Sequence, residues 1–387
     1  MVMSKWEEKR LGEVAPFNYG KSKVSENRDN GQYKVFSSAG FCGYSNETIA
    51  NYGIIIGRKG SAGSLFYSKS PFFSIDTTFY VDKVAESTDI KFIYYYLQIL
   101  NLKIYNNDAA VPGLNRNLAH NLKVKLPPLP TQQKMANILS TYDDLIENNN
   151  RRIELLVKAA QDLYKEWFVR FRFPNYKQTK FDNGLPQGWE VVKIGDIVNI
   201  TSSKRVYLSD YVESGIPFYR SKEVIQLSKG QAITEQLYIS EEKYFEFRDK
   251  YGVPQKNDIL LTSVGTIGIP MLVSNSELFY FKDGNLTWIQ SSSNIELSYY
   301  LFAWLNSEIG KQQIFSSTIG TSQSALTIEN LKNIKIIKPM NEIIIKYKKF
   351  SEEILNEINN LQNQNNNLIK QRDLLLPRLM SGKLEVK

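Results

Sequence analysis

Residues 131–172 read TQQKMANILSTYDDLIENNNRRIELLVKAAQDLYKEWFVRFR. Apolar side chains recur along this stretch, mostly three or four residues apart, at Ile138, Tyr142, Leu145, Ile153, Leu156, Ala160, Leu163 and Trp167. This spacing predicts one long amphipathic helix, because it places the apolar side chains on a single face. At about 1.5 Å per residue the helix would exceed about 50 Å, and a helix of that length needs a partner.

A second stretch supplies the expected partner. Residues 342–376 read EIIIKYKKFSEEILNEINNLQNQNNNLIKQRDLLL. Intervals of three and four residues separate Phe350, Ile354, Ile358, Leu361, Asn365, Leu368, Arg372 and Leu375. This is a heptad pattern, and it predicts that two long helices of one chain pair as a coiled coil.

Each predicted seam contains an asparagine, Asn149 in the first helix and Asn365 in the second. A buried polar side chain costs stability and fixes the register of paired helices. The alternative is that both positions are partly solvated sites on two surface helices. In the first interpretation, the helices form a spacer of defined length.

Composition limits the class of protein. With 387 residues, of which 42% are hydrophobic and 12% aromatic, the chain predicts two or three folded domains rather than disorder. It contains no run of about 18 apolar residues, so no membrane span is expected. The first ten residues, MVMSKWEEKR, lack an apolar signal core, and we expect a cytoplasmic protein.

The residues that catalysis needs are scarce. The chain has one cysteine, Cys42, and one histidine, His120, which excludes Cys/His zinc sites and an internal disulfide framework and disfavours a Ser-His-Asp triad. We expect His120 to be structural. No Gly-Lys pair has the upstream glycine of a phosphate-binding loop. The only Pro-Pro pair follows Leu126, so the motif of adenine methyltransferases is also absent. These absences favour a binding protein.

The formal charge of +8 suggests a polyanionic partner such as nucleic acid. Most of the excess lies before residue 131, and residues 176–338 are balanced. Charge alone therefore supports DNA binding only weakly.

An internal repeat organises the chain. Residues 1–130 predict a mixed domain that precedes the helix region 131–175, and residues 176–338 repeat the plan before the helix region 339–387. The matched segments are Trp6-Glu7 with Trp189-Glu190, Gly20-Lys21 with Ser203-Lys204, residues 54–63 with 259–268, residues 94–97 with 299–302, and residues 121–123 with 330–332. A duplicated domain-helix unit predicts an α+β protein with two pseudo-symmetric domains separated by two antiparallel helices. Such a protein suits a target made of two half-sites.

Several motifs occur in a fixed order along the whole chain. They are LPPLPTQQ at 126–133, ILSTYDDLIE at 138–147, LYKEWFV at 163–169, GLPQGWE at 184–190 and LLPRLMSG at 375–382. With these motifs in this order, the chain resembles the DNA specificity subunits of type I restriction-modification systems. Residues 338–342, before the second helix, lack the proline-rich pattern that precedes the first helix. The sequence therefore does not determine the residue at which the second helix begins.

The resemblance implies that residues 1–130 and 176–338 are target-recognition domains, each reading one half of a bipartite double-stranded DNA sequence. Two methyltransferase subunits would attach to the helices, and restriction subunits with translocase activity are possible further partners. The specificity subunit would have no catalytic site and no cofactor of its own, and S-adenosylmethionine would belong to the methyltransferase subunits.

Polar and basic loops at matching places of the two copies are the candidate DNA-binding sites. The candidates in the first copy are Lys21, Lys23, Ser37, Ser38, Arg58, Lys59 and Ser61. Those in the second copy are Lys204, Arg205, Arg220, Lys222, Thr262 and Ser263. An arginine pairs well with guanine, a lysine with phosphate, and glycine lets the backbone approach DNA closely. The alternative is that these are ordinary solvated hairpin turns.

Two further alternatives stay open. The whole chain could be a coiled-coil adaptor without sequence-specific DNA binding, and only a binding assay separates the two functions. The aromatic cluster of residues 167–173, interleaved with Arg170 and Arg172, resembles a nucleic-acid surface. We expect it instead to pack in a core where the helix meets a domain.

Overall fold

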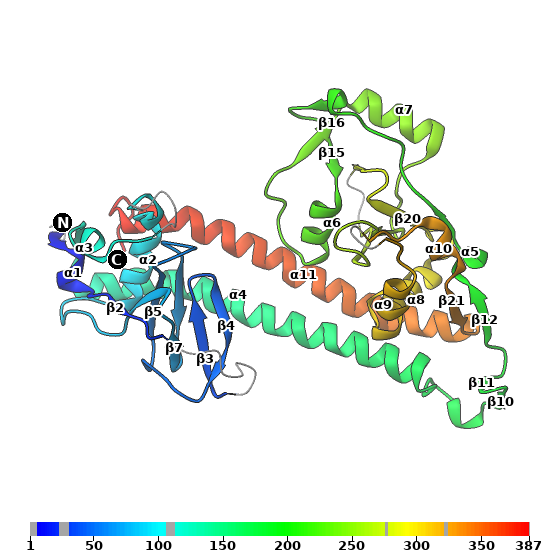
Figure 1. Ribbon diagram of the computed structural model, residues 1–387, viewed down its shortest axis with the longest axis horizontal. Coiled ribbons are helices and arrows are strands. Elements are labelled where there is room, and N and C mark those ends of the chain that lie inside the picture. The colour runs from blue at the N-terminus through cyan, green and yellow to red at the C-terminus, as the bar shows by residue number, and fades with distance from the viewer. Residues whose placement is uncertain (1–5, 23–30, 106–112, 275–277, 321–323, 387) are drawn as a thin grey trace. The chain divides into compact units, whose positions relative to one another are not determined.

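The computed structural model describes residues 6–22, 31–105, 113–274, 278–320 and 324–386. It forms two compact units, the first made of Met1–Glu147 with Asn367–Lys387 and the second of Asn148–Asn366. Each unit contains a domain of mixed helices and strands and a part of each of two long helices (Figure 1). The predicted α+β class is confirmed.

The long helices are α4, Leu129–Tyr164, and α11, Asn341–Met380. A single π turn, Lys165–Val169, continues α4. The chain then leaves the helix, and Phe171 adopts a φ of 55°. The first helix therefore ends a few residues earlier than its sequence pattern predicts, and the second starts at Asn341, the point that the sequence left open.

Within each unit the two helices pair antiparallel. In the first unit, Asp143 of α4 accepts from Arg372 of α11 at 2.6 Å. In the second unit, the side-chain amide of Asn149 donates to Asn365 at 3.0 Å. Both asparagines are only 7% exposed, which confirms the buried pair and makes the solvated alternative wrong.

The predicted seam of α4 is only partly buried. Ile138 and Leu145 are exposed, whereas Met135, Ala136 and Leu139 lie in the core of the first unit. The reason is that α4 packs against its own domain as well as against α11, so its buried face is turned from the line of contact between the helices.

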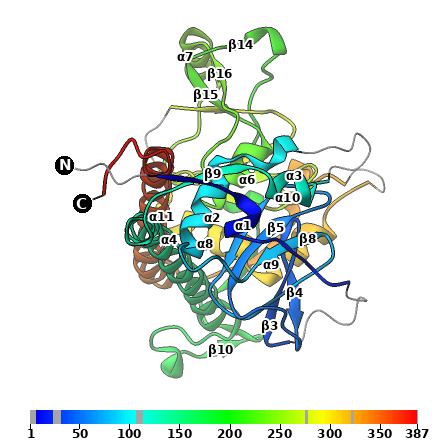
Figure 2. The ribbon, with the colours of Figure 1, turned by 90° about the vertical axis from the view of Figure 1, so that its left-hand side faces the viewer.

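The described residues of the domain in the first unit form three small sheets. Its elements are β1 Glu7–Arg10, α1 Leu11–Val14, β2 Asn18–Tyr19, β3 Tyr33–Ser37, β4 Gly40–Ser45, β5 Gly53–Gly57, β6 Leu65–Ser68, β7 Phe72–Ser74, β8 Thr78–Val81, α2 Ile90–Ile99, a 3-10 turn Leu102–Tyr105, α3 Arg116–His120 and β9 Lys123–Leu126. The strand orders are β2-β8-β5-β6, β4-β3-β7 and β1-β9. Only β3 and β7 pair in parallel among these strands. Figure 2 turns β3, β4, β5 and α1 toward the viewer.

The domain of the second unit repeats this topology with additions. Its elements are β10 Phe181–Asp182, β11 Leu185–Pro186, β12 Glu190–Lys193, α5 Ile194–Ile197, β13 Asn199–Thr201, β14 Tyr211–Val212, β15 Ile216–Tyr219, α6 Ser221–Ser228, β16 Leu237–Ile239, α7 Glu241–Tyr251, β17 Ile259–Thr262, β18 Pro270–Leu272, β19 Tyr280–Phe281, β20 Leu286–Gln290, α8 Ile295–Asn306, α9 Glu308–Ser316, α10 Ile328–Asn333 and β21 Lys335–Lys338. The strand orders β13-β20-β17-β18 and β12-β21 match β2-β8-β5-β6 and β1-β9, and β16-β15-β19 matches β4-β3-β7 with β14 added at its edge. Helices α6 and α7 are the main additions, where the second copy has its longer loops.

In each unit, the long helices and the domain share one hydrophobic core. In the first unit, α2 places Tyr95, Tyr96 and Leu97 in one core with residues of α4 and α11. In the second unit, Tyr300 of α8 packs against Phe168, at 4.8 Å between ring centroids. Trp167, Phe168 and Phe173 are buried there, so the core interpretation of the aromatic cluster is confirmed. Among the described residues, no helix is long and apolar enough to span a membrane.

Candidate nucleic-acid interface

One short segment gathers the candidate loops of the first unit. The backbone N–H of Lys21 donates to Ser74 at 3.0 Å, and that of Arg58 donates to Thr77 at 2.8 Å. Ile75 donates in turn to Phe36 at 3.0 Å, next to the turn at residues 37–40. Three loops far apart in the sequence therefore surround residues 74–78. We did not select this segment from the sequence, although its Asp76-Thr77-Thr78 run between two strands is a polar signal.

The side chains in these loops have different surroundings. Lys21, Lys59 and Ser61 are exposed. Ser38 is buried, and its carbonyl accepts from Ser64 at 2.5 Å. The hydroxyl of Ser37 donates to Gly40 at 3.2 Å, so the two serines stabilise their own turn. Lys23 lies outside the described residues.

Arg58 is held by aromatic rings. Its guanidinium carbon lies 4.9 Å from the ring centroid of Tyr19 and 5.7 Å from that of Phe79, and its NH1 donates to the carbonyl of Asp76 at 3.3 Å. Cation–π contacts of this kind orient an arginine and leave its charge uncompensated. The group is therefore placed at the surface with donors to spare.

The glycines around Arg58 have a local structural role. Gly60 and Gly63 both have a φ of +76°, where a side chain would be strained. A Cβ on Gly57 would lie 2.2 Å from the carbonyl oxygen of Ser61. The loop needs these glycines in order to fold, whatever approaches it.

The loop around Ser263 corresponds to that around Arg58. Ser263 donates to Asn285 at 2.9 Å and accepts from Leu326 at 2.9 Å, as Arg58 donates to Thr77 and accepts from Leu114. Thr262 and Ser263 are buried. The hydroxyl of Thr262 accepts from the backbone of Ile269 at 2.9 Å, and that of Ser263 lies 2.5 Å from the hydroxyl of Thr287. Both side chains stabilise the loop from inside.

The arginine at the start of α6 is bound to a buried carboxylate. Nε and NH2 of Arg220 donate to the two oxygens of Glu223 at 3.1 and 2.7 Å, and the backbone N–H of Arg220 donates to the same group at 2.8 Å. Burial acts to raise the pKa of Glu223, but the hydrogen bonds from Arg220 outweigh it and lower this pKa from 4.5. The side chain of Glu223 is 0% exposed. Arg220 therefore neutralises a buried charge.

The other candidate cations of the second unit are also engaged. Lys222 pairs with Glu235 at 2.9 Å, and Arg205 pairs with Asp283 at 3.0 Å. The ammonium of Lys204 lies 4.8 Å from the ring centroid of Tyr251. In the described part of the first unit, by contrast, neither Arg58 nor Lys59 has a carboxylate partner. Arg205 and Lys222 of the second unit are therefore paired with carboxylates, whereas Arg58 and Lys59 are not paired with any within the described residues of the first unit.

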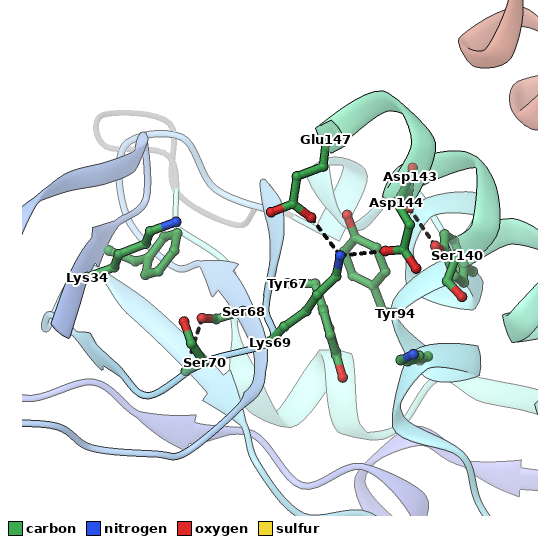
Figure 3. Close-up of a pocket in the computed structure, with 13 residues that line it drawn as sticks. Lys34, Tyr67, Ser68, Lys69, Ser70, Tyr94, Ser140, Asp143, Asp144 and Glu147 are labelled. Carbon is green, nitrogen blue, oxygen red and sulfur yellow. Dashed lines mark hydrogen bonds and ion pairs between the residues drawn. The ribbon is translucent and has the colours of Figure 1, made fainter. Parts of the chain in front are cut away.

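A cavity of about 270 Å³ in the first unit lies beside α4 (Figure 3). The ammonium of Lys69 points between two carboxylates of that helix, Asp144 at 2.5 Å and Glu147 at 2.7 Å. Burial acts to lower the pKa of Lys69, and the hydrogen bonds to these carboxylates outweigh it and raise this pKa. The hydroxyl of Tyr95 donates to Asp143 at 2.5 Å. The wall of the cavity thus fastens the turn after β6 to α4.

His120 has a structural place, as the sequence predicted. Its Nε2 accepts from the backbone N–H of Phe17 at 2.9 Å. Burial, with the nearby charge of Arg116, lowers the pKa of His120, which keeps the ring neutral and able to accept. Within the described ranges, no group of three or more histidine, cysteine, aspartate or glutamate residues is arranged to hold a metal ion.

Comparisons with known proteins agree with this architecture. The family model described as "Type I restriction modification DNA specificity domain" matches residues 3–158 and 186–374. The chain is 27% identical to the type I restriction enzyme MjaVIII specificity subunit of Methanocaldococcus jannaschii, over 100% of this chain and 94% of that protein. It is 29% identical to the MjaIX specificity subunit of the same organism, over 76% of this chain and 69% of that protein.

A solved structure shows the same fold. The S subunit of a type I restriction-modification system from M. genitalium superposes with a TM-score of 0.65 at 16% identity, covering 98% of this chain and 97% of the other. The family match covers both copies of the repeat together with most of both long helices. On this match over most of its length, the chain belongs to the family of type I restriction modification DNA specificity proteins.

Proposed function

We propose that this chain is the sequence-specific DNA-binding subunit of a type I restriction-modification complex. The observation that carries the proposal is the pair of domains with one topology and different side chains at corresponding loop positions. Arg58 and Lys59 of the first unit correspond to Ser263 and Val264 of the second. Two equivalent scaffolds with different loop chemistry suit two half-sites of different sequence.

The proposal assigns roles along the chain. Residues 1–130 and 176–338 are the two target-recognition domains, and residues 131–175 and 339–387 are the spacer helices. Lys21, Arg58, Lys59 and Ser61 contact the first half-site. Lys204, Arg205 and Lys222 contact the second. The remaining described candidates, Ser37, Ser38, Arg220, Thr262 and Ser263, support the loops from within.

The partners follow from the same proposal. Two methyltransferase subunits dock on the long helices, whose exposed apolar side chains Leu155, Ile345 and Leu374 supply contact area. Restriction subunits are further partners where the system has them, and the complex is cytoplasmic. The chain itself is non-catalytic, and S-adenosylmethionine binds to the methyltransferase subunits.

The test is to co-express the chain with the methyltransferase subunits of its own system and to map methylated adenines in the host DNA. We expect a stable complex that methylates one bipartite sequence. A stable complex that methylates without sequence preference, or that shows no sequence-selective DNA binding, would favour the coiled-coil adaptor instead.

A further inference from the structure

Two arginines of the first unit contact the ring of one exposed tyrosine. The guanidinium carbon of Arg116 lies 4.8 Å from the ring centroid of Tyr19, and that of Arg58 lies 4.9 Å from the same centroid. Tyr19 is 47% exposed. We propose that Arg116 is a second DNA-contacting arginine of this unit, positioned together with Arg58 by Tyr19. The inference rests on the proposed function, because it takes DNA to be the ligand.

The backbone fixes both ends of this group. Tyr19 lies on β2, paired with Phe79 of β8, and the two rings meet edge to face at 5.0 Å. Leu114 donates to the carbonyl of Arg58 at 2.8 Å, which holds the start of α3 beside the Arg58 loop. The side chain of Asn115 caps α3 and makes Arg116 its first residue. The two arginines, 58 residues apart in sequence, are therefore brought to one ring by the backbone hydrogen bond between Leu114 and Arg58 and by the cap of α3.

The charges of the group are not balanced within the described part of the unit. Neither Arg58 nor Arg116 forms an ion pair there. Nε of Arg116 is buried and has no hydrogen-bond partner. Two guanidinium groups on one ring repel each other, so the arrangement costs stability unless an anion or a guanine edge engages them.

The second unit shows that the fold does not need these side chains. Ser202, which donates to Leu286 at 3.0 Å, holds the place of Tyr19. Ser263 holds the place of Arg58 and accepts from Leu326, as Arg58 accepts from Leu114. Ile328, two residues after Leu326 and the first residue of α10, holds the place of Arg116. The same backbone therefore forms without any of the three, and the group is a difference in recognition chemistry.

The experiment imports the side chains of the second unit into the first. The full chain, assembled with its methyltransferase subunits, is offered duplexes randomised in both half-sites, as wild type and as Arg116→Ile and Tyr19→Ser. Lys125→Ile is the control, because it removes a positive charge from an exposed position on β9 of the same unit. Thermal unfolding of each variant establishes that it is folded, and the preference for the second half-site serves as an internal reference.

We expect Arg116→Ile to bind the wild-type target about five- to 150-fold more weakly with a relaxed base preference in the first half-site, as for a base-reading arginine. If Arg116 contacts phosphate, the loss is uniform over sequences and the salt slope falls by about one. Either result supports the contact. Affinity, base preference and salt slope equal to those of the wild type and of Lys125→Ile would overturn it.

Conservative variants test the positioning role of the ring. Tyr19→Phe keeps the aromatic face, so we expect it to retain the first half-site preference that Tyr19→Ser loses. An equal loss in both variants would show that the hydroxyl acts, and would remove the positioning role. A wild-type chain that enriches no sequence refutes the proposed function itself. A wild-type chain that enriches a bipartite sequence, with variants that enrich it equally, refutes only the inference.

Discussion

The side-chain amide of Asn149 donates to the oxygen of Asn365 at 3.0 Å, and the amide of Asn365 donates to Asn150 at 2.9 Å. Both residues of the first pair are buried between the two helices. Asn149→Leu leaves the oxygen of Asn365 without its donor, so we expect a loss of about 1 to 3 kcal/mol in the free energy of unfolding. The double variant with Asn365→Leu should recover that stability or exceed it, because two leucines pack as seam residues. Chemical denaturation of the two single variants and the double variant measures the coupling. Additive losses would show that the asparagines act independently.

The two candidate surfaces should control different half-sites. Arg58→Ala with Lys59→Ala should weaken and relax recognition of the first half-site, and Lys204→Ala with Arg205→Ala should do so for the second. A base-reading arginine contributes about 1 to 3 kcal/mol at one position, whereas a phosphate-contacting lysine acts on all sequences and on the salt slope. Enrichment of randomised duplexes by the assembled complex measures both effects. If all four substitutions leave affinity and salt dependence at the wild-type values, the site lies elsewhere.

Arg220→Ala should act on folding before it acts on recognition. It leaves the carboxylate of Glu223 buried without its partner, and an unpaired buried charged group costs roughly 3 kcal/mol. The expected result is a lower unfolding temperature of the second unit. Heat denaturation measures it, with the unfolding of the first unit as reference. The double variant with Glu223→Gln removes the unpaired charge and should be more stable than Arg220→Ala alone. Equal stability of wild type and Arg220→Ala would restore Arg220 as a free DNA-binding group.

The same pair predicts a pH dependence. The pKa of Glu223 is lowered from 4.5 in the folded protein, so its stabilising contribution is fully present above about pH 4.5 and is lost as the pH falls through the folded value. In Arg220→Ala, burial without the arginine raises that pKa, and the carboxyl group protonates more readily. The difference in unfolding free energy between the two proteins should therefore shrink as the pH falls, first through the raised pKa of the variant and then, below about pH 4.5, through the lowered pKa of the wild type. Other carboxylates titrate equally in both proteins, so a difference that is constant from pH 7 to pH 4 would contradict the assignment.

Helix length should set the distance between half-sites. A heptad inserted after Glu154 of α4 and another after Leu361 of α11 keep both apolar patterns and add about 10 Å. At about 3.4 Å per base pair this corresponds to about three more unread base pairs. The second half-site is also rotated around the DNA axis by about a quarter of a helical turn or more, so activity can fall as the gap changes. Methylation of a library with variable gaps measures the preference. A folded, active variant with the original gap would show that the helices only carry partners.

The sequence predicted the long-range plan because apolar periodicity and repeated motifs are local signals. The positions of Asn149 and Asn365 in the two apolar patterns indicated one buried asparagine in each helix, with partly solvated positions as the alternative. Their pairing with each other appears only when the register is known. The start of α11 at Asn341 was not readable, because the proline-rich entry of α4 has no counterpart there.

The candidate loops were harder to judge, because exposure and ion pairing depend on contacts between distant residues. Arg205 pairs with Asp283, 78 positions later, and no pattern links the two. Arg220 and Glu223 are only three residues apart, a spacing at which side chains of opposite charge meet at a helix surface. Arg116 was missed because a short helix with one arginine resembles any surface turn.

The first unit joins residues from both ends of the chain. Met135, Ala136 and Leu139 of α4 share a core with Leu376, Leu379 and Met380 of α11, more than two hundred residues later in synthesis. During translation the apolar face of α4 therefore leaves the ribosome long before its covering helix exists. Contacts of such high sequence separation slow folding. While the second unit is synthesised, the apolar face of α4 stays exposed and prone to aggregation. A partner subunit that binds this half of α4 early would act as a chaperone for the nascent chain, and yield in the cell should depend on co-expression of that partner.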